Sequence, residues 1–326
     1  MKLAFVLAAL AAATALPVSG DPIQVNVSPI ESFAYFGGGS RYGGLEFRGG
    51  LVITSRDKTF GGWSGIEVLD GGRDAVILSD LGYLLKARLD YRNGRLSGLE
   101  VTNQMPALPG KRKSIKRNDS EDLAIGPDNS LAIVLEEDKY QLAVRPFAKG
   151  TWGKPRMEAV PGARRVFGIN KGLESIAVIP PGRPNAGRML AIAERPPKRS
   201  GAANPCWIFG VGTCSIVRRD GFEITSARFL PDGDLVILER RLAPGFDLAM
   251  RLRRIPGSMI GGNTPMDGKI ILEGDLSKQI DNMEGLAVHV DDAGQTILTL
   301  VSDDNQNVFQ RTLMLQFAIV SGGHRG

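Results

Sequence analysis

Short apolar runs recur along the chain. Each run lies about eight to seventeen residues after a segment that resembles Glu-Gly-Leu-Ala. The apolar runs end in an acidic residue in most copies, as in Ala75–Asp80 and Leu131–Glu136. The first segments of the five full copies start about 50–60 residues apart, at Ser64, Ser120, Gly172, Thr225 and Met283. A partial copy precedes them at Gly43. Self-similarity at such a spacing indicates a repeat architecture.

Turn residues separate the two segments of a copy, as in Asp70-Gly71-Gly72 and Pro127-Asp128-Asn129. Gly and Asn tolerate positive φ and Asp caps its own turn, so these positions predict hairpins between antiparallel strands. A third strand is predicted where apolar and polar residues alternate, most clearly over Leu85–Tyr91.

Repeats of about 50 residues with three or four strands each are typical of a β-propeller, in which neighbouring blades bury each other's faces. We therefore predict an all-β protein with a single propeller of five or six blades, each of three to four antiparallel strands. The propeller domain is expected over residues 21–326, and the N-terminal partial copy is expected to lend strands to the last blade and close the ring.

The N-terminal residues predict a secretory signal peptide over residues 1–20. A basic start is followed by the apolar run Leu3–Leu16, which is too short to span a bilayer, and then by small residues. No later segment is apolar enough to span a membrane. We expect a periplasmic or secreted protein that acts as a monomer.

Histidine is scarce in the 326 residues, because His289 and His324 are the only two. This excludes a three-histidine zinc site and an HExxH helix, and it leaves carboxylates, a bound cation, Lys and Arg as the candidate chemical groups. The formal net charge of +5 favours anionic partners. The basic run Lys111–Arg117 lacks interleaved aromatic residues, so it is interpreted as a solvated loop and no nucleic-acid partner is expected.

The two cysteines, Cys206 and Cys214, lie in one short segment. In an oxidising compartment such a pair forms a disulfide. A redox-active pair is the functional alternative, but the spacing is wider than CxxC.

Acidic residues at equivalent places in the copies are expected to converge at one mouth of the central channel. The candidate catalytic residues are Glu121, Glu174 and Glu284, and the fourth copy has Ser226 in place of Glu. The candidate metal ligands are Asp80, Glu136, Glu194, Glu239, Asp303 and Asn305.

Converging carboxylates repel each other unless a cation, Ca²⁺ above all, or basic side chains offset their charge. The candidate substrate-binding residues are Arg56, Lys139, Lys171, Arg195, Arg240 and Arg311. A network of structural salt bridges between blades is the alternative interpretation of the same acids.

Several repeat phrases carry a resemblance to a known family. They are Gly61–Ile66, Ile77–Gly82, Asn170–Glu174, Leu238–Arg240, and Asn282–Ala287 with Ser302–Asn305. In this order they resemble the phytase-like family, whose domain is described as having esterase-like activity of phytase. The resemblance covers about residues 36–317, and it implies an exported bacterial propeller similar in architecture to the alkaline β-propeller phytases.

The function expected from these features is hydrolysis of ester or phosphoester bonds in an anionic small molecule, with a cation at the channel mouth. A non-catalytic propeller that binds a ligand or protein in the envelope and a calcium-dependent lactonase-like hydrolase are the two alternatives.

Overall fold

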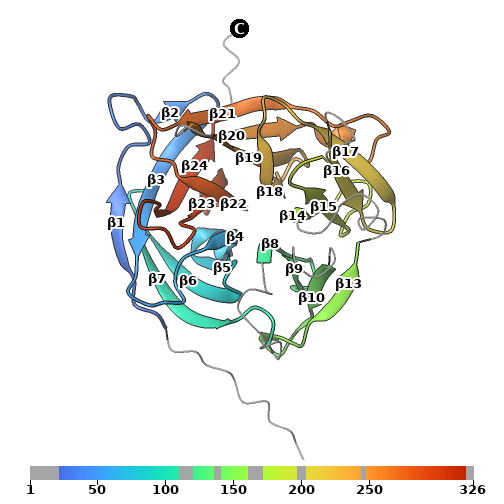
Figure 1. Ribbon diagram of the computed structural model, residues 1–326, viewed down its shortest axis with the longest axis horizontal. Helices are drawn as coiled ribbons and strands as arrows, with labels where there is room; N and C mark the ends of the chain where they lie inside the picture. The colour runs from blue at the N-terminus through green and yellow to red at the C-terminus, as the bar shows by residue number, and fades with distance from the viewer. Residues whose placement is uncertain are drawn as a thin grey trace, which may run out of the picture.

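The computed structural model describes residues 22–109, 120–135, 141–160, 172–196, 203–243 and 247–320. The predicted signal peptide, the basic run Lys111–Arg117 and the candidates Glu136, Lys139 and Lys171 lie outside these residues. The described residues form five antiparallel sheets around a central axis, which is a five-bladed β-propeller (Figure 1). This confirms the predicted fold class and selects five blades over six.

The four strands of blades I to IV run in sequence order from the axis outward. In the fifth blade three strands in sequence order are followed by one from the N-terminal part of the chain, and two additional short strands flank it. Blade I contains β4 (Trp63–Leu69), β5 (Asp74–Ser79), β6 (Tyr83–Arg92) and β7 (Arg95–Pro106). Blade II contains β8 (Ser120–Ile125), β9 (Leu131–Leu135), β10 (Gln141–Arg145) and β13 (Arg156–Ala159). Blade III contains β14 (Leu173–Val178), β15 (Met189–Ala193), β16 (Ala203–Ile208) and β17 (Gly212–Val217). Blade IV contains β18 (Glu223–Phe229), β19 (Leu235–Ala243), β20 (Asp247–Ile255) and β21 (Lys269–Asp275). Blade V contains β22 (Asn282–Val290), β23 (Thr296–Asp303), β24 (Thr312–Ile319) and β3 (Leu45–Thr54), flanked by β1 (Asn26–Ile30) and β2 (Arg41–Tyr42).

The small elements are a hairpin of β11 (Phe147–Ala148) and β12 (Thr151–Trp152), and two 3₁₀ turns at Asp70–Gly72 and Gly257–Met259. In the described parts of the chain, no helix is long and apolar enough to cross a membrane.

The ring is closed by the N-terminal strand β3. It pairs with β24 from the C-terminal end of the chain, with Val52 opposite Leu313 and Leu45 opposite Ile319. The first blade-forming strand of the sequence thus becomes the fourth strand of blade V. This agrees with the prediction that the N-terminal partial copy completes the last blade.

The antiparallel order places the connections at two edges of the ring. The inner strands β4, β8, β14, β18 and β22 surround the axis (Figure 1). The start of each inner strand lies at the same edge as the end of the second strand and the start of the third. We call this edge the mouth. The turns within the first and the third hairpin of each blade lie at the opposite edge.

Apolar side chains between blades supply the core. Between blades IV and V, Phe33, Phe47 and Phe317 are fully buried, and their rings pack at centroid distances of 5.0 to 5.9 Å. The second strands are buried on both faces, which explains why apolar runs such as Leu235–Leu238 do not alternate with polar residues.

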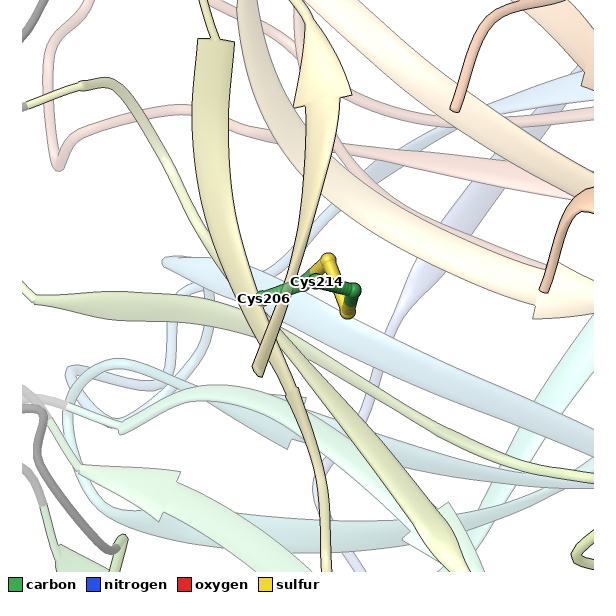
Figure 2. Close-up of a disulfide and its surroundings, with 2 residues drawn as sticks. All are labelled: Cys206 and Cys214. Carbon is green, nitrogen blue, oxygen red and sulfur yellow. A yellow bond between two sulfur atoms is a disulfide. The ribbon is translucent and has the colours of Figure 1, made fainter. Parts of the chain in front are cut away.

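The predicted disulfide is present and joins the two outer strands of blade III (Figure 2). Cys206 of β16 lies directly opposite Cys214 of β17 in the strand register. The bond therefore ties together a hairpin that backbone hydrogen bonds already pair, which agrees with a structural role.

Replacing both cysteines with serine is expected to lower the free energy of unfolding by about 2–3 kcal/mol, because the unfolded chain regains the freedom of a short closed loop. Denaturant unfolding of the oxidised protein and of the Cys206→Ser/Cys214→Ser variant measures this difference. Equal midpoints and slopes for the two proteins would contradict it.

Candidate functional site

A β-bulge interrupts the start of each inner strand. The pairing register shifts by one residue at Ser64, Glu174, Thr225 and Glu284, and across Glu121 and Asp122 in β8. A bulge bends its strand and re-aims the extra side chain. The same local device therefore occurs in all five blades, and three of the five bulges carry a glutamate at the mouth.

The three glutamates at the bulges come close to one another. Glu174 is half-buried, and its pKa lies well above the usual range because of desolvation and because Glu121, Glu194 and Glu284 are near. Glu121 also forms a hydrogen bond with Glu174. Two carboxyl groups can share a hydrogen bond only when one of them is protonated, so this contact favours a protonated member of the pair.

Three further carboxyl groups at the mouth have raised pKa values, and burial is the main cause in Glu223, Glu284 and Asp303 alike. Burial raises the pKa of Glu284 to about 8, although the Arg240 guanidinium acts in the opposite direction. Burial also raises the pKa of Asp303 to about 6, and the nearby Asp304 and Asp281 add to this effect. The mouth is therefore a place where acidic groups titrate near neutral pH.

Arg240 and Arg195 at the mouth are paired with carboxylates. Arg240 donates hydrogen bonds through Nη1 to Glu284 and to Asn282, and its Nη2 lies 3.6 Å from Glu194 Oε1. Arg195 lies 2.7 Å from Glu194 and 3.2 Å from Glu223. Six carboxyl groups thus share these two guanidinium groups and that of Arg218, which lies 3.6 Å from Glu223. The six are Glu121, Glu174, Glu194, Glu223, Glu284 and Asp303.

In the fourth copy, the strand register differs by one residue from the alignment of the repeats in the sequence. Asp303 lies opposite Asn282 in blade V, whereas Arg240 lies opposite Glu223 at the equivalent place in blade IV. The strand register therefore makes Arg240, and not Glu239, the equivalent of Asp303. Blade IV places an arginine in a ring where the other described blades have Asp80, Glu194 and Asp303.

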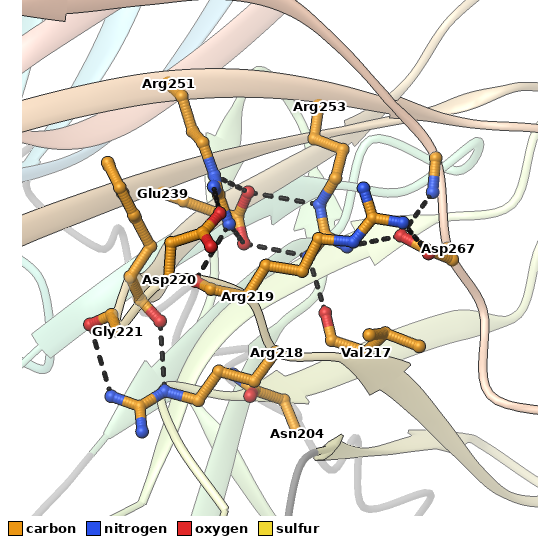
Figure 3. Close-up of polar contacts among 12 residues, drawn as sticks. Asn204, Val217, Arg218, Arg219, Asp220, Gly221, Glu239, Arg251, Arg253 and Asp267 are labelled. Carbon is orange, nitrogen blue, oxygen red and sulfur yellow. Dashed lines mark hydrogen bonds and ion pairs between the residues drawn. The ribbon is translucent and has the colours of Figure 1, made fainter.

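Glu239 does not join the mouth, so the expected convergence of this residue is wrong. Its side chain is directed away from Arg240, because neighbouring residues of a strand face opposite sides. Arg251 and Arg253 from β20 hold its buried carboxylate at 2.8 Å each (Figure 3). This cluster continues to Asp220 and Asp267 and has the structural salt-bridge role that was the alternative interpretation.

The remaining candidates lie around the mouth with other contacts. The carboxylate of Asp80 packs against Gly62, where a Cβ would come within 1.9 Å of Oδ1. Asn305 has a φ of +46°, and its N–H donates to Asp303 Oδ1 at 2.6 Å, which is the geometry of a turn. Arg311 donates to Ile280 O and Gln279 Oε1. Arg56 is exposed in the connection between β3 and β4.

No group of three or more His, Cys, Asp or Glu side chains is arranged to hold a metal ion within the residues that the structure describes. The expected Ca²⁺ site therefore stays a prediction.

A second charged group that the sequence analysis missed closes the axis below the mouth. Arg228 of β18 forms a two-pronged ion pair with Asp122 of β8, with both Nη–Oδ distances at 2.9 Å, and its Nε lies 2.9 Å from Glu67 of β4. Arg228 and Asp122 are buried. Burial raises the pKa of Glu67 to about 7, Arg228 opposes this effect, and Asp122 adds to it.

We call Arg228, Asp122 and Glu67 the hub. Hydrogen bonds connect the hub to all five inner strands. Ser175 and Ser226 donate their hydroxyls to Asp122 Oδ2, and Leu286 of β22 donates its N–H to Ser226 Oγ. At the position of Ser226 the other copies have small or acidic residues. Gly65 is the equivalent residue in blade I, and a Cβ added to it would lie only 3.0 Å from Asp122 Oδ1, so a larger side chain would crowd the ion pair. Small side chains at this level therefore leave room for one central ion pair.

The fold and the mouth define a five-bladed propeller with a carboxylate-rich site at one end of its axis. The chain belongs to the phytase-like family, described as having esterase-like activity of phytase, and the family model matches residues 58–306. This confirms the resemblance seen in the repeat phrases. A search of curated proteins finds no match.

Three solved structures are similar to the chain at low identity. The α-L-arabinofuranosidase PaAbf62A from Podospora anserina, in complex with cellotriose, is 12% identical with a TM-score of 0.45, over 85% of this chain and 97% of that chain. The allergen Mala s 1 of Malassezia sympodialis is 12% identical with a TM-score of 0.41, over 86% and 92% of the two chains. The Dos1 propeller is 12% identical with a TM-score of 0.34, over 87% and 68%.

Proposed function

We propose that this phytase-like propeller hydrolyses ester or phosphoester bonds of an anionic small molecule at the mouth, after export from the cytoplasm. The observation that carries the proposal is the hydrogen-bonded pair of Glu121 and Glu174 on neighbouring blades, in which the pKa of Glu174 lies well above its usual range. A carboxyl group whose pKa is raised toward the operating pH is suited to acid–base catalysis.

In this proposal the two members of the pair have different roles. Glu174 donates its proton to the oxygen of the departing alcohol, while the ester C–O or phosphoester P–O bond breaks. Glu121 accepts a proton from the attacking water, whose oxygen forms the new bond to carbon or phosphorus. The pair regains its starting state when the proton returns from Glu121 to Glu174.

Arg240 and Arg195 position the surrounding carboxylates in this proposal. Each already contacts two carboxylates, so an incoming anionic substrate has to compete with Glu194, Glu223 and Glu284 for them. An anionic substrate therefore requires additional positive charge at the mouth.

The side chains at the mouth are of the type that a hard divalent cation prefers, since carboxylate oxygens outnumber guanidinium groups there, but in the described residues they are not arranged as a set of three ligands. Glu194 and Asp303 are the members of the predicted ligand set that lie in the cluster, and they would hold the ion. When bound, such an ion would supply Lewis-acid polarisation of the ester oxygen and charge for the anionic group.

The experiment that tests the function is an assay of purified protein on phytate, on small chromogenic esters and on lactones, each with and without a chelator. Release of phosphate or of the ester alcohol supports the proposal. Lactone opening alone supports the lactonase-like alternative, and no turnover by folded protein supports the non-catalytic alternative.

Added Ca²⁺ is expected to raise the melting temperature, because a ligand that binds only the native state stabilises it by RT ln(1 + [L]/Kd). At about 100 times Kd this amounts to about 2.7 kcal/mol. A Glu194→Gln/Asp303→Asn variant should lose the increase, whereas Glu100→Gln on the outside of blade I should keep it. An identical melting curve with Ca²⁺ and with chelator would contradict a calcium site.

A further inference from the structure

The buried carboxylate of Asp122 joins the two strand segments that carry the Glu121–Glu174 pair. Asp122 directly follows Glu121, and both lie in the bulge at the start of β8. From blade III, Ser175 Oγ and Ile176 N both donate to Asp122 Oδ2, at 3.1 and 3.2 Å. Ser175 directly follows Glu174, which lies at the bulge of β14. One carboxylate thus holds the residue after Glu174 against the residue after Glu121.

The orientation of the Asp122 carboxylate is itself fixed. The side chain is fully buried, and it also accepts hydrogen bonds from Leu123 N at 2.9 Å, from Ser226 Oγ at 3.3 Å and from both Nη atoms of Arg228 at 2.9 Å. These donors and those of β14 come from blades II, III and IV. Any rotation of the carboxylate would leave buried donors without an acceptor, which is costly. Asp122 is therefore a rigid attachment point for both segments.

A second connection runs from Asp122 to the glutamate of blade V. Ser226 Oγ donates to Asp122 Oδ2 and accepts the N–H of Leu286 at 3.2 Å. Leu286 lies two residues after Glu284, the third glutamate at a bulge. The two hub serines thus lead to different glutamates, because Ser175 adjoins Glu174 whereas Ser226 reaches the segment of Glu284.

The contact between Glu121 and Glu174 requires this kind of support. The two side chains come from different blades, and the charges of Glu194 and Glu284 also act on Glu174. Neighbouring carboxylates repel each other, so they would move apart if their strands were free to shift. A pair of groups keeps a defined geometry when hydrogen bonds behind it lock the supporting backbone.

We propose that Asp122 is a positioning residue of the mouth, which sets the contact of Glu174 with Glu121 through Ser175 and Ile176 and the place of Glu284 through Ser226. The catalytic consequence of this inference rests on the proposed function. The positioning itself is a property of the folded protein without substrate, so it can be measured in the absence of turnover.

The test is the Ser175→Ala variant, which removes one donor to Asp122 and leaves the glutamates and the Arg228 ion pair in place. NMR of protein with isotope-labelled glutamate carboxyl carbons, in the presence of a chelator, follows the titration of Glu174. Its signal is the one that is absent from Glu174→Gln. The hydrogen bond with Glu121 raises the pKa of Glu174, so a loosened contact should lower the titration midpoint by about 0.5–1 pH unit, the equivalent of one hydrogen bond.

Two matched variants separate positioning from a general loss of stability. Ser226→Ala also removes a buried hydroxyl from the hub, but it should shift the midpoint of Glu284 by more than that of Glu174. Thr299→Val in β23 removes a buried hydroxyl that accepts a hydrogen bond from Gln316, and it should leave both midpoints unchanged. A general loss of stability would affect the three variants alike.

The inference is overturned by a native Glu174 midpoint in Ser175→Ala, or by equal shifts in Ser175→Ala and Thr299→Val. If Ser175→Ala does not fold, the Glu284 midpoint in Ser226→Ala decides the same question. Once a substrate is known, Ser175→Ala should lower kcat by up to about 10²-fold with little change in KM, because a small misplacement of reacting groups slows the chemical step.

The inference and the proposed hydrolysis fail separately. Shifted midpoints together with no turnover by native protein would retain the positioning role and remove the hydrolysis. Turnover by native protein together with an unshifted Glu174 midpoint in Ser175→Ala would do the reverse.

Discussion

Replacing Arg228 with methionine is expected to lower the free energy of unfolding by about 3–5 kcal/mol at neutral pH, which is the range for breaking a buried ion pair by removing one partner. Methionine has a similar length but no charge, so Asp122 and Glu67 would be left in the hub without their cation. The loss should be large because Asp122 is fully buried and its hydrogen bonds connect inner strands of different blades.

The loss is expected to grow with pH. Without Arg228, burial would raise the folded-state pKa of Glu67 further above its unfolded-state value, so the folded protein would bind more protons than the unfolded protein. Stability then falls as pH rises through this interval, from about pH 4 upward. Denaturant unfolding of the native and Arg228→Met proteins at several pH values measures this slope.

Two variants test whether the ion pair itself causes the effect. Arg254→Met, in the same blade, removes a partly exposed arginine that pairs with Asp232 and Asp234, and it should cost at most about 1 kcal/mol. The double variant Arg228→Met/Asp122→Asn should recover part of the loss, because it removes the buried charge as well. A single variant as stable as the native protein, or one whose loss is independent of pH, would contradict the role of the hub.

The repeat in the sequence was sufficient to predict the architecture. Turn residues and apolar runs recur in each copy, and the partial copy at Gly43 becomes β3 of the closing blade. The number of blades was left between five and six because the length of the predicted mature chain, divided by the repeat period, allows either count. Only the pairing of β3 with β24 shows that the partial copy completes blade V.

The site was predicted less well, because its geometry depends on single-residue shifts. An apolar run that ends in Glu239-Arg240 is compatible with two alignments, and the side chains of adjacent strand residues face opposite sides. The bulge at Thr225 fixes the register and brings Arg240 to the mouth. Glu223 was missed for the same reason, since it lies before the segment that was aligned.

The hub could not be predicted from spacing. Arg228 and Glu67 each lie within an inner strand, where a charged residue among apolar ones was a visible signal. Their partner Asp122 directly follows Glu121, and alternation would place these two side chains on opposite faces of β8. The bulge there removes that alternation, so Glu121 reaches the mouth while Asp122 reaches the hub.

Replacing Glu174 with glutamine is expected to reduce kcat of the proposed hydrolysis by about 10²- to 10⁴-fold, the range for loss of a general acid. Glutamine has nearly the same shape and can still hydrogen-bond to Glu121, but it has no acidic proton to give to the leaving oxygen. The limb of the pH–rate profile that reports this proton should disappear. Steady-state kinetics across pH on the substrate identified in the hydrolysis assay measures both effects.

Stability separates a catalytic loss from a folding defect. Because burial and neighbouring carboxylates raise the pKa of Glu174, the ionised form is unfavourable in the folded protein, and Glu174→Gln should melt at or above the native temperature. Glu100→Gln, on the exposed side of blade I, should keep the native kcat, since its carboxylate contacts only Arg88 at the surface. Native kcat in Glu174→Gln would remove this residue from the chemistry, whereas equal losses in both variants would show that the assay does not report on the mouth.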